Sequence, residues 1–299
     1  MKRRIVQHGS SSLTVTLPYS WAQQFNLKKG DELEADIRGN SVVFSTAKAK
    51  GSAKKEVEVS QFGVFTKNNL SQVYQLGYDE VIIYLDNETG VEDIKQRIAE
   101  CLGFEIININ ERTIEIRSIA HTLEQDFDVL LRKTFLITKQ MGDELFKALK
   151  DSEFSKLKNI RTLESLNNKF VLACIRILNK RGYSNPDRTM QMYDMLKLIE
   201  RFCDEFKHIC DIKYTRALDK RILSFFDNLL KYYDNFYQLF YKFSVQGKKK
   251  VYLDRKELLQ SAHKLLQNTK AEDTVALHHL LAALDKAYDA AGEYFTMIL

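Results

Sequence analysis

The sequence predicts a multidomain α+β protein in which two turn-rich β units come first and a long all-helical region follows. Glycine marks this change, because eight of the twelve glycines precede Phe104. The two prolines are Pro18 and Pro186, so few residues interrupt helices in the second half of the chain. The predicted domains are residues 1–50, 51–118 and 119–299.

The first domain is expected to consist of short strands and one short helix. Residues 13–17 alternate apolar and polar side chains with period two, as a half-buried strand does. A module below about 60 residues buries little apolar surface alone, so we expect it to form a homodimer. The expected elements are strands over 3–8 and 13–17, a helix over 20–25, and strands over 33–37 and 41–44 joined at Gly39-Asn40.

Within the second domain, residues 56–117 have the predicted order βαβαββ. Val81–Leu85 is a continuous apolar run, which is typical of a strand covered on both faces. Its sequence contains no candidate nucleophile, glycine-rich phosphate loop or cluster of metal-ligating residues. We interpret this domain as a spacer or docking module.

From about Ile119 onward, apolar residues recur at helical spacing. Breaks near Gly182, Lys213 and Gly247 predict six helices. Their arrangement as two sets of three suggests an internal repeat.

The third helix of each set carries three polar side chains along one stripe, at i, i+4 and i+8. Two carboxylates at i and i+4 repel each other, and a hard cation with oxygen ligands would offset that repulsion. The stripes are Glu200, Asp204 and His208 in the first set, and Asp285, Asp289 and Glu293 in the second.

The alternative interpretation of both stripes is a solvated charged face. Lys197, Arg201 and Lys207 lie within reach of the first stripe, so ordinary salt bridges are available there. The second stripe lies among alanines and has Lys286 as its nearby cation. On local grounds the second stripe is therefore the stronger metal candidate.

Residues 119–299 resemble the PhoU family, a pair of three-helix bundles whose E(D)xxxD motifs bind multinuclear iron or magnesium clusters. The third-helix motif is kept in both repeats. The second-helix motif is half kept in the first repeat, where Asn168 follows Glu164, and is lost in the second, where Ser261 follows Glu257. The stripes and the resemblance together give the candidate ligands of a magnesium or iron ion: Glu164, Asn168, Glu200, Asp204, His208, Asp285, Asp289 and Glu293.

The first domain resembles the SpoVT/AbrB family of swapped-hairpin dimers. The resemblance rests on Gly9–Pro18, the short helix that follows, and Leu27–Leu33. We call the first domain, residues 1–50, the head and residues 119–299 the body. Such a head, followed by the middle unit and a PhoU-like body, is similar to archaeal-type phosphate uptake regulators. The order of the domains carries this resemblance more than any single motif does.

The first domain also carries most of the excess positive charge. Residues 1–50 hold eight basic and four acidic side chains, a balance of +4, and the whole chain has +5. A basic terminal module suggests a polyanionic partner, and the resemblance implies DNA. Thr14, Ala22 and Gln23 stand where that family commonly has arginines. The candidate DNA-binding residues are Lys2, Arg3, Arg4, His8, Ser10, Ser11 and Ser12.

We therefore expect a non-catalytic cytoplasmic regulator that binds DNA through its head and a metal ion or partner through its body. The alternative is an interaction protein that modulates a phosphate ABC transporter, with a head that only dimerises. No Ser/His/Asp or Cys/His constellation is evident, which disfavours an enzyme, a metal-dependent hydrolase included. No signal peptide is evident and no apolar run approaches the roughly 20 residues that span a bilayer, so no membrane insertion is expected. The four cysteines form no CxxC pair and are expected to be reduced core thiols.

Overall fold

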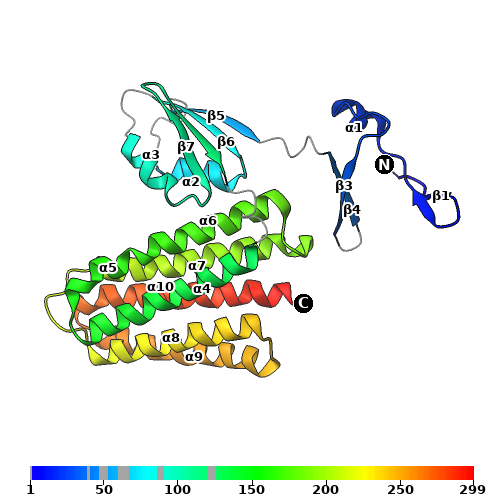
Figure 1. Cartoon of the computed structure of the whole chain (residues 1–299). Helices are drawn as coiled ribbons and strands as arrows, with labels where there is room; N and C mark the ends of the chain where they lie inside the picture. Colours follow the sequence, from blue (N-terminus) through cyan, green and yellow to red (C-terminus); the bar gives the residue numbers. More distant parts are fainter. Residues whose placement is uncertain (1, 39–40, 47–52, 60–66, 86–90, 120–125) are drawn as a thin grey trace. The chain divides into compact units, whose positions relative to one another are not determined.

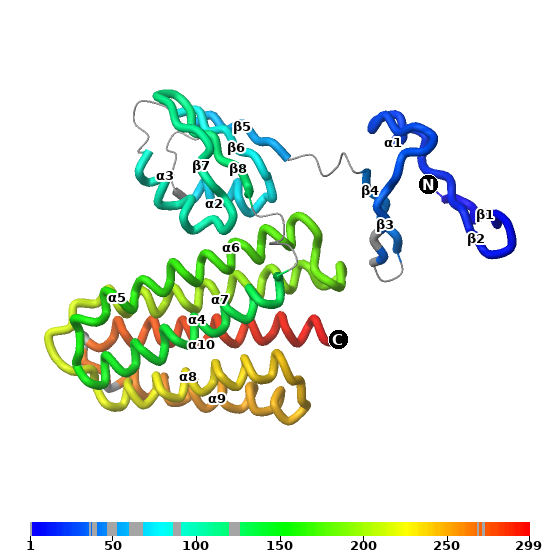
Figure 2. The backbone as a smooth tube through the Cα atoms, viewed as in Figure 1, coloured from blue at the N-terminus to red at the C-terminus, as the bar shows by residue number. Residues whose placement is uncertain are grey.

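The chain divides into two compact units, Met1–Ala53 and Lys54–Leu299. Their content matches the predicted class, with β-hairpins, a mixed sheet with helices, and an all-helical region (Figure 1, Figure 2). Within the described residues, no helix is both long and apolar enough to cross a lipid bilayer. The computed structural model describes residues 2–38, 41–46, 53–59, 67–85, 91–119 and 126–299.

The first unit consists of two separate antiparallel hairpins and a short helix between them. In the first hairpin Val6 lies opposite Thr14, and in the second Leu33 lies opposite Thr46. Gly9 begins the first turn with a φ of 71°, in the left-handed region that favours glycine. The elements are β1 (Val6–His8), β2 (Ser12–Thr14), α1 (Tyr19–Gln24), β3 (Leu33–Arg38) and β4 (Ser41–Thr46).

The first unit buries almost none of its apolar side chains. Leu13 is 71% exposed and Ile37 is 78% exposed, and Thr46 is the one buried residue among those described there. The first two strands are shorter than predicted, because in the described part of the unit they pair only with each other. The predicted turn at Gly39-Asn40 lies outside the described residues.

The middle of the chain has the predicted order βαβαββ. Its sheet has the strand order β5-β6-β8-β7, in which β5 and β6 are parallel and the other neighbours are antiparallel (Figure 2). The elements are β5 (Lys54–Glu58), α2 (Lys67–Gln75), β6 (Glu80–Tyr84), α3 (Val91–Ile98), β7 (Phe104–Ile109) and β8 (Thr113–Ser118).

The expectation that both faces of β6 are covered is wrong. Val81 and Ile83 are each 1% exposed, whereas Tyr84 points the other way and is exposed. The buried pair shares one core with Leu70 of α2 and Ile94 of α3. The two helices therefore place their apolar stripes on the same alternate positions of the strand.

Six long helices and the short helix α5 form the region from residue 126 onward (Figure 1). The predicted break at Gly182 is confirmed, since this glycine ends α6 with a φ of 76°. The predicted break near Gly247 is also confirmed, because α8 ends at Tyr241 and α9 begins at Val245. The Ser244 side chain accepts a hydrogen bond from the Gly247 amide and caps α9. The helices are α4 (Phe127–Lys150), α5 (Leu157–Arg161), α6 (Leu163–Arg181), α7 (Thr189–Cys210), α8 (Lys220–Tyr241), α9 (Val245–Asn268) and α10 (Ala271–Met297).

The long helices pack as two sets of three, as predicted. Helices α4, α6 and α7 contact one another, as do α8, α9 and α10, and the third helices α7 and α10 pack closely against each other. Phe202 of α7 stacks on Tyr233 of α8 with ring centroids 4.5 Å apart, so one apolar core runs through both sets. All four cysteines are buried and free.

The middle sheet docks on the helical region through Arg176 of α6. Its guanidinium donates to the carbonyls of Tyr74 and Tyr78 at 3.0 and 2.7 Å and to Asp79 Oδ1 at 2.6 Å. Leu172, one turn earlier on α6, belongs to the apolar core of the sheet. Residues 54–299 are therefore one compact unit.

Replacing Arg176 with Met should lower the free energy of unfolding by about 2 kcal/mol, because buried acceptors would lose a charged donor. Urea unfolding followed by circular dichroism measures this. The control is Arg161→Met, which removes a half-exposed ion pair with Asp211 and should cost less than about 1 kcal/mol. Equal losses in the two variants would contradict the docking role of Arg176.

Candidate functional site

The candidate DNA-binding residues all lie exposed on the first unit. Lys2, Arg3 and Arg4 precede β1, and they have no ion-pair partner among the described residues. His8 ends β1 and pairs across the hairpin with Ser12. The structure thus places seven polar side chains within one short segment: Lys2, Arg3, Arg4, His8, Ser10, Ser11 and Ser12.

This segment offers the chemistry that a phosphate backbone needs. Exposed cations without a protein partner are available to neutralise phosphates and release bound counterions. Serine hydroxyls around a tight turn can donate to phosphate oxygens and set the register of the protein on the duplex.

Two positions that commonly carry arginine in AbrB-type heads have structural contacts instead. The Thr14 hydroxyl donates to the Val6 carbonyl oxygen at 3.1 Å and ties β1 to β2. Gln23 donates to the Tyr19 hydroxyl at 3.2 Å within α1. These positions support the head and add no positive charge.

The head exposes large apolar side chains on both of its hairpins. Leu13 and Ile37 come from different hairpins and are the most exposed of its large aliphatic side chains. Val6 and Val42 are also more than half exposed. A second copy of the same surface would supply the missing burial, in agreement with the predicted homodimer.

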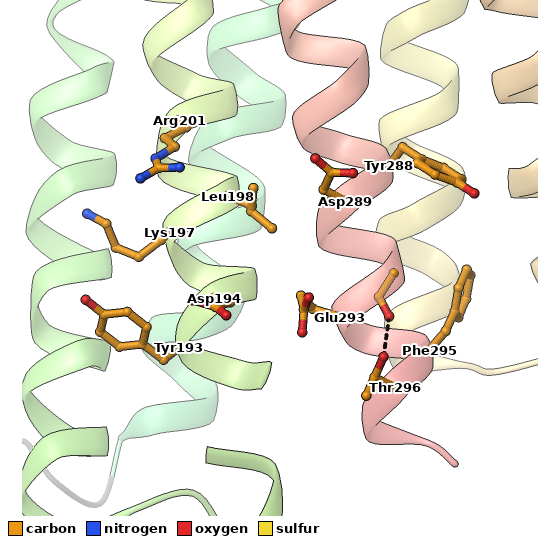
Figure 3. A pocket seen from close by; sticks show the side chains of 11 residues that line it. Tyr193, Asp194, Lys197, Leu198, Arg201, Tyr288, Asp289, Glu293, Phe295 and Thr296 are labelled. Carbon is orange, nitrogen blue, oxygen red and sulfur yellow. Dashed lines mark hydrogen bonds between the residues drawn. The ribbon is translucent and has the colours of Figure 1, made fainter. Parts of the chain in front are cut away.

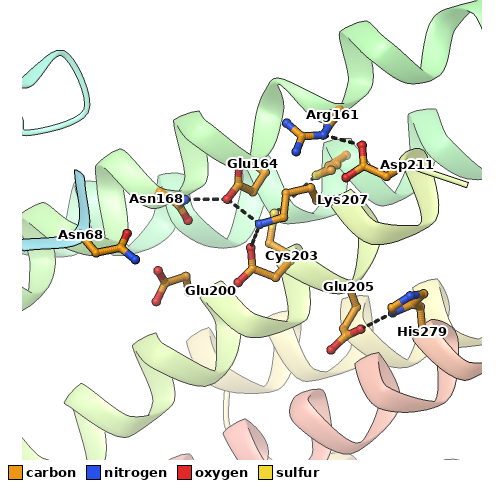
Figure 4. Close-up of polar contacts among 12 residues, drawn as sticks. Asn68, Arg161, Glu164, Asn168, Glu200, Cys203, Glu205, Lys207, Asp211 and His279 are labelled. Atoms are coloured by element: carbon orange, nitrogen blue, oxygen red, sulfur yellow. Dashed lines mark hydrogen bonds and ion pairs between the residues drawn. The ribbon is translucent and has the colours of Figure 1, made fainter. Parts of the chain in front are cut away.

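In the helical region, the first set brings three candidate metal ligands together around a lysine (Figure 4). Lys207 of α7 donates to Glu164 Oε1 of α6 at 3.1 Å and to Asp204 Oδ1 at 2.5 Å. The Asn168 amide donates to the same Glu164 oxygen at 2.7 Å. The carboxylates predicted to face a metal ion thus face hydrogen-bond donors of the chain itself.

Burial and the ion pairs with Lys207 shift the pKa values of this group in opposite directions. Burial and the neighbouring Glu164 carboxyl raise the pKa of the Asp204 carboxyl, and Lys207 offsets only part of their combined effect. Burial would also raise the pKa of Glu164, but Lys207 and Asn168 together hold it below its ordinary value. For Lys207, burial lowers the pKa, and the two carboxylates hold it above its usual range. Lys207 therefore stays an ammonium at neutral pH.

The other two members of the first stripe lie apart from this group. Glu200 pairs with Lys197 on its own helix. The His208 ring stacks on His279 of α10 with centroids 5.1 Å apart. His279 Nδ1 lies 2.7 Å from Glu205 Oε2, and Lys286 of α10 lies 3.1 Å from the other oxygen of Glu205. This polar contact joins α7 to α10.

The second stripe is divided between two surroundings. Asp285 lies 3.4 Å from the Arg255 guanidinium of α9, which also covers the Tyr288 ring at 4.0 Å. Asp289 and Glu293 instead line a cavity between α7 and α10. Lys286, the expected local cation of this stripe, contacts Glu205 of α7 instead.

The cavity between α7 and α10 has a volume of about 660 Å³ and mixed charge (Figure 3). Asp194 of α7 joins Asp289 and Glu293 on its wall, with Lys197 and Arg201 also present. Burial raises the pKa of Glu293, and the Asp194 and Asp289 carboxylates add to the rise. The wall at Glu293 therefore has an excess of negative charge.

The geometry of the first set does not fit a metal ion, because the two closest carboxylate oxygens already accept hydrogen bonds from Lys207. In the part of the chain that the structure describes, no group of three or more His, Cys, Asp or Glu side chains is placed to hold a metal ion. Metal binding by the second stripe stays a prediction. Magnesium often uses only one or two carboxylates and keeps several waters.

The contact of Lys207 with Glu164 of α6 has no signal in the sequence. The spacing of three residues between Asp204 and Lys207 indicated only the contact between those two side chains. The second contact, with Glu164, depends on how α6 packs against α7, and no local pattern reports it. The same is true of Arg255 and Asp285, which are 30 residues apart.

In the comparison with known proteins, a family model matches part of the first unit. Residues 6–43 match the family model described as antidote-toxin recognition MazE, bacterial antitoxin. This stretch runs from the start of β1 into β4, so the first unit contains a MazE/AbrB-like domain. No curated protein and no solved structure matches the chain.

Replacing Ile37 with Glu should shift the protein from dimer toward monomer, because a carboxylate would enter the covered apolar surface. Light scattering of the wild type should give twice the 34.8 kDa of one chain. The control Val245→Glu changes a β-branched residue that is 71% exposed at the start of α9, and it should leave the mass unchanged. A wild type with the mass of one chain would contradict dimerisation.

Proposed function

We propose that this chain is a non-catalytic, cytoplasmic DNA-binding regulator whose target process is phosphate uptake. One observation carries the DNA part of the proposal: three exposed cations, which have no ion-pair partner in the described part of the chain, precede the first hairpin of a MazE/AbrB-like domain. In a homodimer each such segment occurs twice, so one duplex would meet two basic segments related by symmetry.

The helical region supports the link to phosphate uptake. It has the two sets of three helices that the resemblance to the PhoU family implies, joined through their third helices. In this proposal the helical region receives a signal or a partner, and the head delivers the response. A magnesium or iron ion belongs to the proposal at the second set alone, where Asp289 and Glu293 line the cavity.

A second candidate function is modulation of a phosphate ABC transporter by protein contact, with a head that only dimerises. The contacts of Thr14 and Gln23 favour it, because they place structural side chains where AbrB-type DNA binders commonly have arginine. Recovery of transporter subunits with the purified chain, in the absence of DNA fragments, would favour this second function.

Changing Lys2, Arg3 and Arg4 together to alanine should weaken binding to duplex DNA from upstream of the chain's own coding sequence. Fewer neutralised phosphates should also reduce the dependence of affinity on salt, by up to about five units of the log–log slope for a dimer. Fluorescence anisotropy across a salt series at fixed temperature measures both quantities.

The matched control changes Lys248, Lys249 and Lys250 of α9 to alanine. It removes the same charge from the second unit and should leave DNA affinity within about twofold of the wild type at moderate salt. Unchanged binding by the Lys2/Arg3/Arg4 variant at low salt would sink the DNA function.

A further inference from the structure

Two carboxylates from different helices share one ammonium in the first helical set. Lys207 Nζ lies 3.1 Å from Glu164 Oε1 and 2.5 Å from Asp204 Oδ1. The side chains are 19% exposed for Lys207, 10% for Glu164 and 31% for Asp204. Charges this sheltered need a partner, because water solvates them poorly. In Figure 4, dashed lines join Glu164 to Lys207 and to Asn168.

The Glu164 carboxylate is the acceptor in both of its hydrogen bonds described here. Its Oε1 accepts from Lys207 at 3.1 Å and from the Asn168 amide at 2.7 Å. A hard cation in this place would need oxygen ligands at about 2.0–2.6 Å in place of these donors. Asn168 would have to present its carbonyl oxygen instead of its amide, and the ammonium would have to leave.

The ammonium already supplies what a cation would supply here. It offsets the repulsion between the two carboxylates and ties α6 to α7. A metal ion that entered without displacing it would meet a like charge at close range in a sheltered site.

We infer that the Lys207 ammonium is a tethered cation that takes the place of a metal ion between Glu164 and Asp204. The first helical set is thus held together without metal, and its stability does not depend on metal supply. This inference concerns the second unit and is independent of DNA binding by the head.

The inference does not extend to the second set. There the Arg255 guanidinium lies 3.4 Å from Asp285, whose side chain is 55% exposed. That pair is open to water and leaves Asp289 and Glu293 on the cavity wall. In the first set, the chain itself places a neutralising charge at a sheltered position. In the second set, the ion pair of Asp285 is exposed, and the chain supplies no such sheltered charge among the described contacts.

The test is Lys207→Met in the full chain, titrated with Mn²⁺ as a paramagnetic probe by electron paramagnetic resonance. Methionine keeps the apolar stem and removes the charge, so two carboxylates are left to face each other. The variant should bind Mn²⁺ at least tenfold more tightly than the wild type, and Mn²⁺ should raise its melting temperature. Failure to gain Mn²⁺ affinity would overturn the inference.

The matched control is Lys250→Met, which removes the lysine that pairs with Asp254 on the same helix, α9. It should gain no Mn²⁺ affinity, because Asp254 lacks a carboxylate partner on a second helix among its described contacts. A gain equal to that of Lys207→Met would overturn the inference.

A second comparison holds even if Lys207→Met does not fold. Wild type and Asp204→Asn should bind Mn²⁺ alike, since Asp204 is already occupied by Lys207. Loss of a wild-type Mn²⁺ site in Asp204→Asn would show that a metal binds there and would overturn the inference. DNA binding by the same samples, measured separately, reports on the head and leaves this outcome unaffected.

Discussion

Ion pairs between neighbouring elements fix how the elements of the second unit meet, and the chain supplies both charges of each pair. Arg176 and Asp79 join the middle sheet to α6. Lys207 joins α6 to α7 through two carboxylates, and Glu205 joins α7 to α10. A sheltered charge that lost its partner would be strongly destabilising, so each pair fixes how two elements meet. The apolar core supplies the bulk of the stability, and these pairs specify the arrangement.

The head follows the opposite arrangement. Lys2, Arg3 and Arg4 are exposed and have no ion-pair partner among the described residues, and the large apolar side chains of the same unit are exposed as well. A unit with free cations and uncovered apolar groups is suited to two partners of different chemistry. A second copy of the chain would cover the apolar part, and a polyanion would neutralise the cations. In the second unit, the ion pairs described above have a structural role. In the head, the unpaired cations are available to bind a partner.

Much of the fold could be predicted because its signals are local. Hydrophobic periodicity located the helices, and the βαβαββ order followed from alternating strand and helix patterns. The glycine marked the break near Gly247, and the Ser244 cap fixes the residue at which α9 begins. The exposed face of β6 was not predictable from its apolar run, since the run does not show that both helices pack on the same side.

The candidate sites were only half predictable. The i, i+4 carboxylates were evident from spacing, but their neutralising partners lie on other helices. Lys207 reaches across 43 residues to Glu164, and Arg255 reaches across 30 residues to Asp285. Side-chain pairs of this kind follow from helix packing, which a single sequence does not specify. The head residues could be proposed because their signal, a basic cluster before a hairpin, is local, and their role in DNA binding stays a prediction.

DNA binding by the free charge in the head is tested most directly in the cell. DNA crosslinked to the full chain would be recovered and sequenced for the wild type and for the Lys2/Arg3/Arg4 alanine variant at equal expression. The account predicts a limited set of sites enriched by the wild type and lost in the variant. Equal recovery from both, or no site enriched above an unrelated protein, would contradict it.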